Sequence, residues 1–215
     1  PDTSDLSERS DENSDTPTLF ETFLTIRDVD HTYHLADTPE LQHQLFSELA
    51  KQSSFCFDIE TTSLDRFEAR LLGIAFSWKA REGWYLPYSE SLKSNLQSLF
   101  SNSAEKIGHN LKYDLSVLLN HRIEVSGPFF DTMLADILVS PERRHTMDYL
   151  SEILLGYSPV KLLDLVAAVS NRQAQPSDDL FSYAEQTKPS KELDVSSIPL
   201  EKLAEYAAED ADVTW

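Results

Sequence analysis

Cysteine is almost absent from this 215-residue chain, whose one cysteine, Cys56, rules out an intrachain disulfide. A chain without disulfides is typical of a reducing compartment, so we expect a cytoplasmic location and interpret Cys56 as a small core residue. No apolar run approaches the roughly 18 residues of a membrane-spanning helix, and no signal-peptide pattern opens the chain, so we expect no membrane partner. The scattered histidines His109, His121 and His145 lack a zinc-binding spacing and are interpreted as hydrogen-bonding residues.

Basic residues are also scarce, with 18 lysines and arginines against 37 acidic residues and a formal net charge of −19. Residues 1–30 contain nine acids and two bases, which leaves about −12 for residues 31–215. Most proteins that bind nucleic acid do so through a basic surface, so we expect this chain to bind free nucleic acid weakly. Bound cations invert the potential within a site, and an acidic domain can hold a phosphate there.

The first notable motif is an acidic pair at the end of an apolar strand. Residues 53–60, Ser-Ser-Phe-Cys-Phe-Asp-Ile-Glu, favour a β-strand whose side chains alternate between two faces. Asp58 and Glu60 then point the same way, about 7 Å apart at a rise of ~3.3 Å per residue. In so acidic a chain such a pair also arises by chance as two solvated carboxylates. Two anions at the end of a buried strand are nevertheless costly unless a cation compensates them.

The second motif, Asn-Leu-Lys-Tyr-Asp at residues 110–114, follows a predicted strand at 105–108 and opens a predicted helix. Asn110 is expected to be the N-cap of this helix. Asp114 lies one turn in, opposite much of the apolar stripe, and taken alone would be a solvated helix aspartate. The stripe itself is expected to consist of leucines at four positions, Leu111, Leu115, Leu118 and Leu119.

The third motif lies in a helix predicted over residues 200–213. Tyr206 and Asp210 are four residues apart, so they stand one above the other on the same helix face. Glu209 and Asp212 are rotated away from Asp210, and we interpret them as solvated charges.

Taken together, the three motifs resemble the 3′–5′ exonucleases with an Asp-Glu-Asp-Asp metal site, in the subgroup with a tyrosine four residues before the last aspartate. The flanking sequence is similar to the proofreading domain of bacterial DNA polymerase I, from about residue 30 to the last residue. The segments that carry this resemblance are 57–65, 108–114 and 206–214.

The resemblance implies two divalent cations, Mg²⁺ or Mn²⁺ with Zn²⁺ as a further possibility, beside the phosphate to be cleaved. Asp58, Glu60 and Asp210 would ligate one cation, and Asp58 with Asp114 would hold the second. Glu60 and Tyr206 would orient the attacking water. A phenol of ordinary pKa is better suited to orient the water by a hydrogen bond than to remove its proton. The catalytic set is therefore Asp58, Glu60, Asp114, Tyr206 and Asp210.

The resemblance also assigns residues to the DNA 3′ end, which would be single-stranded or frayed. Leu64 would wedge against a base, and Arg144 would reach a phosphate, although a solvated arginine suits that position equally well. The remaining contacts to the terminal nucleotides are implied for Thr61, Asn110 and Tyr113.

The order of elements predicts an α/β fold, a mixed sheet flanked by helices that the resemblance identifies as ribonuclease-H-like. Residues 1–18, rich in Ser, Asp and Glu, are expected to be a flexible acidic linker, followed by one domain over 19–215. Residues 171–197 are expected to be largely irregular.

Strands are predicted at 31–35, 53–60, 71–78, 83–86, 105–108 and 129–131, and the second to fourth are expected to form an antiparallel meander. The other helices are predicted at 39–51, 91–100, 132–139 and 146–155.

The natural chain is expected to continue at both ends, because position 1 is proline and Trp215 arrives within a helix. The resemblance implies a polymerase domain after this segment as its partner, and a 5′-nuclease domain before it. Three other functions stay open on sequence alone: a free-standing exoribonuclease of the ribonuclease D type, a catalytically silent scaffold domain, and a nucleic-acid-binding module without chemistry.

Overall fold

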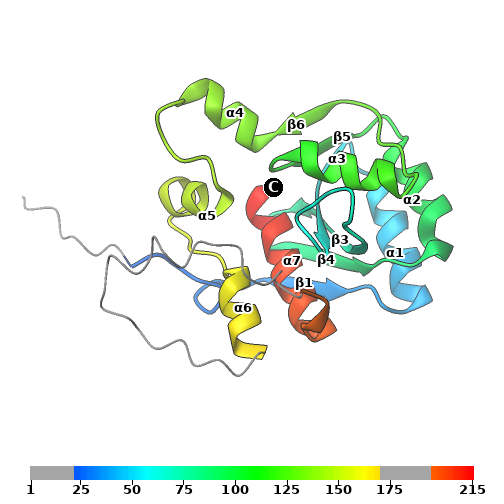
Figure 1. The fold of residues 1–215 in the computed structure, drawn as a ribbon, viewed down its shortest axis with the longest axis horizontal. Coiled ribbons are helices and arrows are strands. Elements are labelled where there is room, and N and C mark those ends of the chain that lie inside the picture. Colours follow the sequence, from blue (N-terminus) through cyan, green and yellow to red (C-terminus); the bar gives the residue numbers. More distant parts are fainter. Residues whose placement is uncertain (1–21, 170–194) are drawn as a thin grey trace, which may run out of the picture.

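The computed structural model of the chain describes residues 22–169 and 195–215 (Figure 1). The predicted linker at 1–18 lies outside the described residues, as does the part of the predicted irregular segment between 171 and 194. At the end of that segment, residues Val195–Ser197 form a 3₁₀ turn (η3). In the described part of the chain, no helix is both long and apolar enough to cross a membrane.

Six strands in the described residues form one mixed sheet in the order β1-β4-β3-β2-β5-β6. Strands β2, β3 and β4 are antiparallel neighbours, which confirms the predicted meander. The pairs β1–β4, β2–β5 and β5–β6 are parallel. The strands span Thr32–Leu35 (β1), Ser54–Thr61 (β2), Leu71–Lys79 (β3), Glu82–Pro87 (β4), Glu105–Gly108 (β5) and Phe129–Asp131 (β6).

Helices cover both faces of the sheet, and Figure 1 shows the longest of them, α7 in red, running across the strands. The elements α1, α2 and α3 pack on one face, and α7 with α6 and η3 packs on the other. The helices are α1 (Pro39–Leu49), η1 (Glu90–Leu92), α2 (Lys93–Phe100), α3 (Leu111–Asn120), α4 (Thr132–Val139), α5 (Met147–Leu150) with the π-helical turn η2 (Ser151–Leu155), α6 (Leu162–Val169) and α7 (Leu200–Thr214).

Alternation along β2 separates the two faces of the sheet, as its sequence predicts. Phe55, Phe57 and Ile59 enter the apolar core beneath α1, α2 and α3. Asp58 and Glu60 face the opposite side, where α7 lies. Cys56 is fully buried, which confirms its interpretation as a core residue. Strand β2 therefore supplies apolar side chains to the core beneath α1, α2 and α3 and acidic side chains to the face covered by α7.

Helix α6 is an element that the sequence analysis missed. Its sequence, Leu-Leu-Asp-Leu-Val-Ala-Ala-Val, is a strongly apolar run of only eight residues. Leu162, Leu165 and Val166 pack against the cluster beneath α7. A short apolar run has no clear period, so its pattern does not distinguish a helix from a buried strand.

Close packing of small residues brings α7 against the sheet. Ala204, Ala207 and Ala211 are buried on the side of the helix that meets Ala75 of β3. A Cβ atom added to Gly83 of β4 would lie 2.5 Å from the backbone oxygen of Ala208. Any residue larger than glycine at position 83 would therefore prevent the backbone of α7 from lying this close to β4.

Replacing Gly83 with alanine should lower the free energy of unfolding by about 1–3 kcal/mol, because the new methyl group forces α7 away from β4. Urea unfolding followed by circular dichroism measures the change. A Gly83→Ala protein as stable as the wild type would contradict this description of the contact between helix and strand.

Candidate metal centre

Three acidic side chains from two elements meet on the α7 face of the sheet. Asp58 and Glu60 come from the end of β2, and Asp210 comes from α7. One ligand oxygen of each lies within 4.8 Å of those of the other two. Glu60 and Asp210 are buried. The structure thus brings together three of the four carboxylates that the sequence singled out.

Asp114 of α3 lies close to this group but outside it. Asp114 is only 4% exposed. Taken alone, its position in the helix sequence had suggested a solvated aspartate. The buried side of α3 consists of Leu111, Asp114, Val117 and Leu118, while Leu119 is 59% exposed. The predicted apolar stripe is therefore wrong in part, because the helix is rotated so that Asp114 faces inward. The charge of Asp114 contributes to the raised pKa of Glu60, as expected of neighbouring carboxylates.

Burial makes this cluster electrostatically unfavourable in the absence of a cation. Desolvation raises the pKa of Asp58 to about 7 and raises the pKa values of Glu60, Asp114 and Asp210 well above their usual range. Repulsion from Asp58 adds to the shift in each of the other three. Oδ2 of Asp114 and Oδ1 of Asp210 have no hydrogen-bond partner. Unpartnered buried carboxylate oxygens are the donor set that Mg²⁺ and Mn²⁺ prefer, so these residues fit divalent cations.

Tyr206 lies one helical turn before Asp210, on the same face of α7 as that carboxylate. Desolvation and the charge of Asp210 raise the pKa of Tyr206 far above its ordinary value. The phenol therefore keeps its proton at neutral pH, and it can donate a hydrogen bond but cannot act as a base.

Two further acidic residues of α7, Glu209 and Asp212, anchor the helix to its surroundings. Glu209 is fully buried and accepts hydrogen bonds from the Tyr157 hydroxyl and, at 3.1 Å, from the Val160 backbone N–H. Asp212 accepts from the Tyr33 hydroxyl at 2.9 Å and from the Arg81 backbone N–H at 2.6 Å. The prediction that both are solvated charges is wrong, because other segments of the chain cover these sides of α7.

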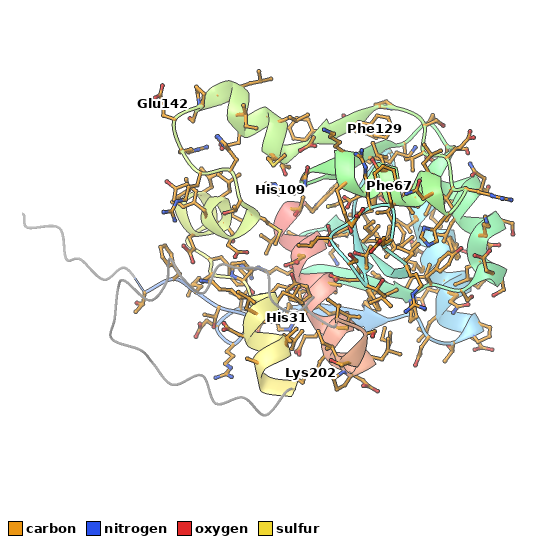
Figure 2. All side chains as sticks on the ribbon, in the orientation of Figure 1. His31, Phe67, His109, Phe129, Glu142 and Lys202 are labelled. Atoms are coloured by element: carbon orange, nitrogen blue, oxygen red, sulfur yellow. The ribbon has the colours of Figure 1, made fainter. Side chains whose placement is uncertain are left out.

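The loop after β2 presents two large apolar side chains to solvent. Oγ1 of Thr61 and the Tyr113 hydroxyl lie 2.8 Å apart, and both donate to the Ser63 carbonyl oxygen, at 3.0 and 2.6 Å. These two predicted substrate residues thus hold the loop in place. Leu64, predicted to wedge against a base, is 88% exposed. Phe67, labelled in Figure 2, is 76% exposed and was missed by the sequence analysis, although an aromatic residue in a polar loop is a recognisable signal.

Asn110 occupies the predicted N-cap position of α3, but its side chain does not cap the helix. It adopts a left-handed backbone with φ of 65°, and its side chain is exposed. The capping acceptor is Asp131, which takes the N–H groups of Asn110 at 3.1 Å and Leu111 at 2.9 Å. Asp131 also accepts from the first N–H groups of α4, so one carboxylate joins two helix ends. The sequence analysis missed this role, although an aspartate before a helix favours capping.

Arg144 is exposed in the connection between α4 and α5, the segment in which Figure 2 labels Glu142. Its neighbours Arg143 and His145 both bind Asp136, which is buried.

The predicted hydrogen-bonding roles of the histidines are confirmed. Nδ1 of His145 lies 2.6 Å from Asp136, Nδ1 of His109 lies 2.9 Å from Thr132, and Nδ1 of His121 lies 2.9 Å from the Val117 oxygen.

An apolar cleft of about 710 Å³ opens at the C-terminal end of α7, between that helix, α4 and α5. His109, Val139, Leu154 and Trp215 are among its lining residues. None of the four carboxylates lines it, so the cleft is separate from the candidate metal centre.

A family described as 3′–5′ exonuclease matches residues 33–215 of the chain. DNA polymerase I of Borreliella burgdorferi is 27% identical over 230 residues, covering 98% of this chain and 23% of that protein. DNA polymerase I of Pseudomonas aeruginosa is 31% identical over 182 residues, covering 77% of this chain and 18% of that protein. The chain thus spans less than a quarter of the length of these curated relatives.

Two solved structures share the fold. Brucella melitensis NrnC has a TM-score of 0.58 at 22% identity, covering 86% of this chain and 77% of that one. Trypanosoma brucei RNase D has a TM-score of 0.56 at 17% identity, covering 86% of this chain and 64% of that one. The predicted α/β fold, a mixed sheet of the ribonuclease-H-like exonuclease type, is confirmed.

The cluster predicts how the stability of the metal-free protein depends on pH. Because its folded pKa values are raised, the folded state keeps protons that the unfolded state releases, and stability should fall as the pH rises from about 4 to neutrality and above. Asp210→Asn should therefore stabilise the metal-free protein by about 1–3 kcal/mol at pH 8, and by less at pH 5.

Thermal unfolding in chelator at the two pH values measures this difference between variant and wild type. Asp37→Asn, at an exposed position outside the cluster, is the control and should change little at either pH. A gain for Asp210→Asn that is equal at both pH values would contradict the electrostatic account.

Proposed function

Because the chain belongs to the 3′–5′ exonuclease family, we propose that it removes nucleoside 5′-monophosphates from the 3′ end of DNA with two divalent cations. The observation that carries this proposal is the meeting of Asp58, Glu60 and Asp210, with Asp114 buried beside them. The curated relatives, named DNA polymerase I, support DNA as the substrate and proofreading as the task.

The carboxylates divide into two sets of ligands. Asp58, Glu60 and Asp210 would hold one cation, and Asp58 together with Asp114 would hold the other, with Mg²⁺ or Mn²⁺ as the preferred ions. When bound, such a pair of cations activates the attacking water and offsets the charge that develops on the leaving oxygen. The raised pKa values support this assignment, since a cation favours the ionised carboxylates that burial alone disfavours.

The remaining work falls to side chains that orient the reactants. Tyr206 keeps its proton and would donate a hydrogen bond, while the Glu60 carboxylate would accept one from the attacking water. The water oxygen forms a new bond to phosphorus as the bond from phosphorus to the 3′ oxygen breaks. The attacking water gives up a proton and the leaving 3′ oxygen takes one up. The products are a deoxynucleoside 5′-monophosphate and a strand one nucleotide shorter.

The exposed residues around the centre would hold the strand. Leu64 would pack against a terminal base, a contact that tolerates any sequence. Asn110 and Arg144 present exposed polar side chains that would contact sugar and phosphate. Thr61 and Tyr113, whose hydroxyls bind Ser63, would act on the terminal nucleotides chiefly by fixing the loop that carries Leu64.

A polymerase domain that follows this segment is the proposed partner. The relatives are chains more than four times as long as the matched region. Residues 31–215 carry a net charge of about −12, so the domain would bind DNA weakly unless another domain delivers the primer end. The similarity to NrnC and RNase D favours one second candidate, a free-standing exoribonuclease.

Asp58→Ala or Asp210→Ala should reduce metal-dependent hydrolysis at least about 100-fold while the protein remains folded, because each removes a ligand. Tyr206→Phe should be milder, since it removes an orienting hydrogen bond and no ligand. Release of single nucleotides from a 5′-labelled oligonucleotide measures the rates. Asp212→Asn, on the same helix but bound to β1, is the control that should retain most activity. A fully active Asp58→Ala protein would refute the two-cation assignment.

A single-stranded DNA oligomer should be degraded faster than a duplex, because residues 22–169 and 195–215 contain no element evident for melting paired strands. It should also be degraded faster than an RNA oligomer of the same sequence. Rates on the three substrates at fixed salt and fixed Mg²⁺ provide the comparison. Preferential degradation of the RNA would favour the exoribonuclease in place of the proofreading enzyme.

A further inference from the structure

Tyr85 carries a buried hydroxyl without a partner. Among the described residues, the fully buried side-chain atoms that lack a hydrogen bond include the hydroxyl of Tyr85 together with Oδ2 of Asp114 and Oδ1 of Asp210. The latter two are carboxylate oxygens of the candidate metal centre. An unpartnered buried hydroxyl is destabilising, so the position of the Tyr85 hydroxyl calls for a physical reason.

The register of the sheet places this hydroxyl beside Glu60. Tyr85 of β4 pairs with Ala75 of β3, and its ring lies over the neighbouring Gly73. A Cβ atom added to Gly73 would lie 2.2 Å from the Tyr85 hydroxyl oxygen. Gly73 in turn pairs with Glu60 across the β2–β3 ladder. Since adjacent strands are about 4.8 Å apart, the hydroxyl projects over β3 toward the carboxylate-bearing end of β2.

The surroundings of Tyr85 are apolar. The ring is fully buried in the cluster that Leu203, Ala204 and Ala207 of α7 form over the sheet. A tyrosine hydroxyl has an ordinary pKa of about 10, so the Tyr85 hydroxyl carries its proton at neutral pH. Glycine at position 73 provides the space that the hydroxyl occupies. A protonated donor is thus held next to Glu60.

We propose that Tyr85 is a positioning residue of the metal centre, whose hydroxyl donates a hydrogen bond to the Glu60 carboxylate once cations are bound. This inference rests on the proposed function, because it takes Glu60 to be a cation ligand. A ligating carboxylate directs lone pairs to the ion, and its remaining lone pairs can accept from a second donor that fixes its orientation. Tyr206 lies on the same face of α7 as Asp210, so each of these two ligands has a phenol near it.

Tyr85→Phe tests the proposal, because phenylalanine keeps the ring packing and removes only the hydroxyl. In chelator, the variant should be as stable as the wild type or more stable, since it loses an unpartnered polar group. Its affinity for Mn²⁺, measured by titration calorimetry in the absence of DNA, should fall about 10- to 100-fold. The rise in melting temperature that Mn²⁺ produces should shrink accordingly.

Tyr33→Phe is the matched control, a second tyrosine of the same sheet. Its hydroxyl donates to Asp212 at 2.9 Å, so the variant should lose stability in chelator yet bind Mn²⁺ with wild-type affinity. A further measurement shows whether Tyr85 acts through Glu60. In a Glu60→Gln background, Tyr85→Phe should have no additional effect on Mn²⁺ affinity.

Wild-type Mn²⁺ affinity in Tyr85→Phe would overturn the proposal, and so would a loss of metal-free stability as large as that of Tyr33→Phe. Absence of any Mn²⁺ binding by the wild-type protein would overturn it as well. If the wild type binds Mn²⁺ and Tyr85→Phe weakens that binding, but neither DNA nor RNA is hydrolysed, the positioning role stands and the proposed function fails.

Discussion

Repulsion among buried carboxylates is the constraint on which the rest of this structure depends. Asp58, Glu60, Asp114 and Asp210 come from β2, α3 and α7, and the fold removes most of their surface from water. Such a cluster opposes folding until cations compensate it. The apolar layer beneath α1, α2 and α3 and the alanine-rich contact of α7 with the sheet must therefore supply the stability that the cluster withdraws.

Helix α7 must be fixed in position for the cluster to have a defined geometry. Its alanines press against the strands, and Gly83 lets its backbone approach β4. Glu209 binds the 157–160 segment, and Asp212 binds β1 and the turn before β4. The helix thus contributes one acidic residue to the candidate metal centre and uses two others to hold itself in place. Asp131 has a comparable role for α3, because it accepts the first N–H groups of the helix that carries Asp114.

The parts of the site that sequence predicts are those set by local periodicity. A strand alternates with a period of two, which places Asp58 and Glu60 on one face whatever surrounds them. A helix brings residues four apart together, which is why Tyr206 and Asp210 could be paired from sequence. The burial of Glu209 and Asp212 depends on segments distant in the chain, so helical geometry alone misassigned them. The rotation of α3 likewise reflects its packing on the sheet. The role proposed for Tyr85 depends on the register of β3 with both of its neighbours, which the sequence does not give.

Crystals of the protein soaked in Mn²⁺ and measured at the manganese absorption edge test the central claim most directly. The account predicts two anomalous peaks on the α7 face of the sheet. One should contact Asp58, Glu60 and Asp210, and the other should lie on the side of Asp58 that faces Asp114. Absence of a peak among these carboxylates at saturating Mn²⁺ would contradict the account, because nothing would then offset the repulsion that the fold sustains.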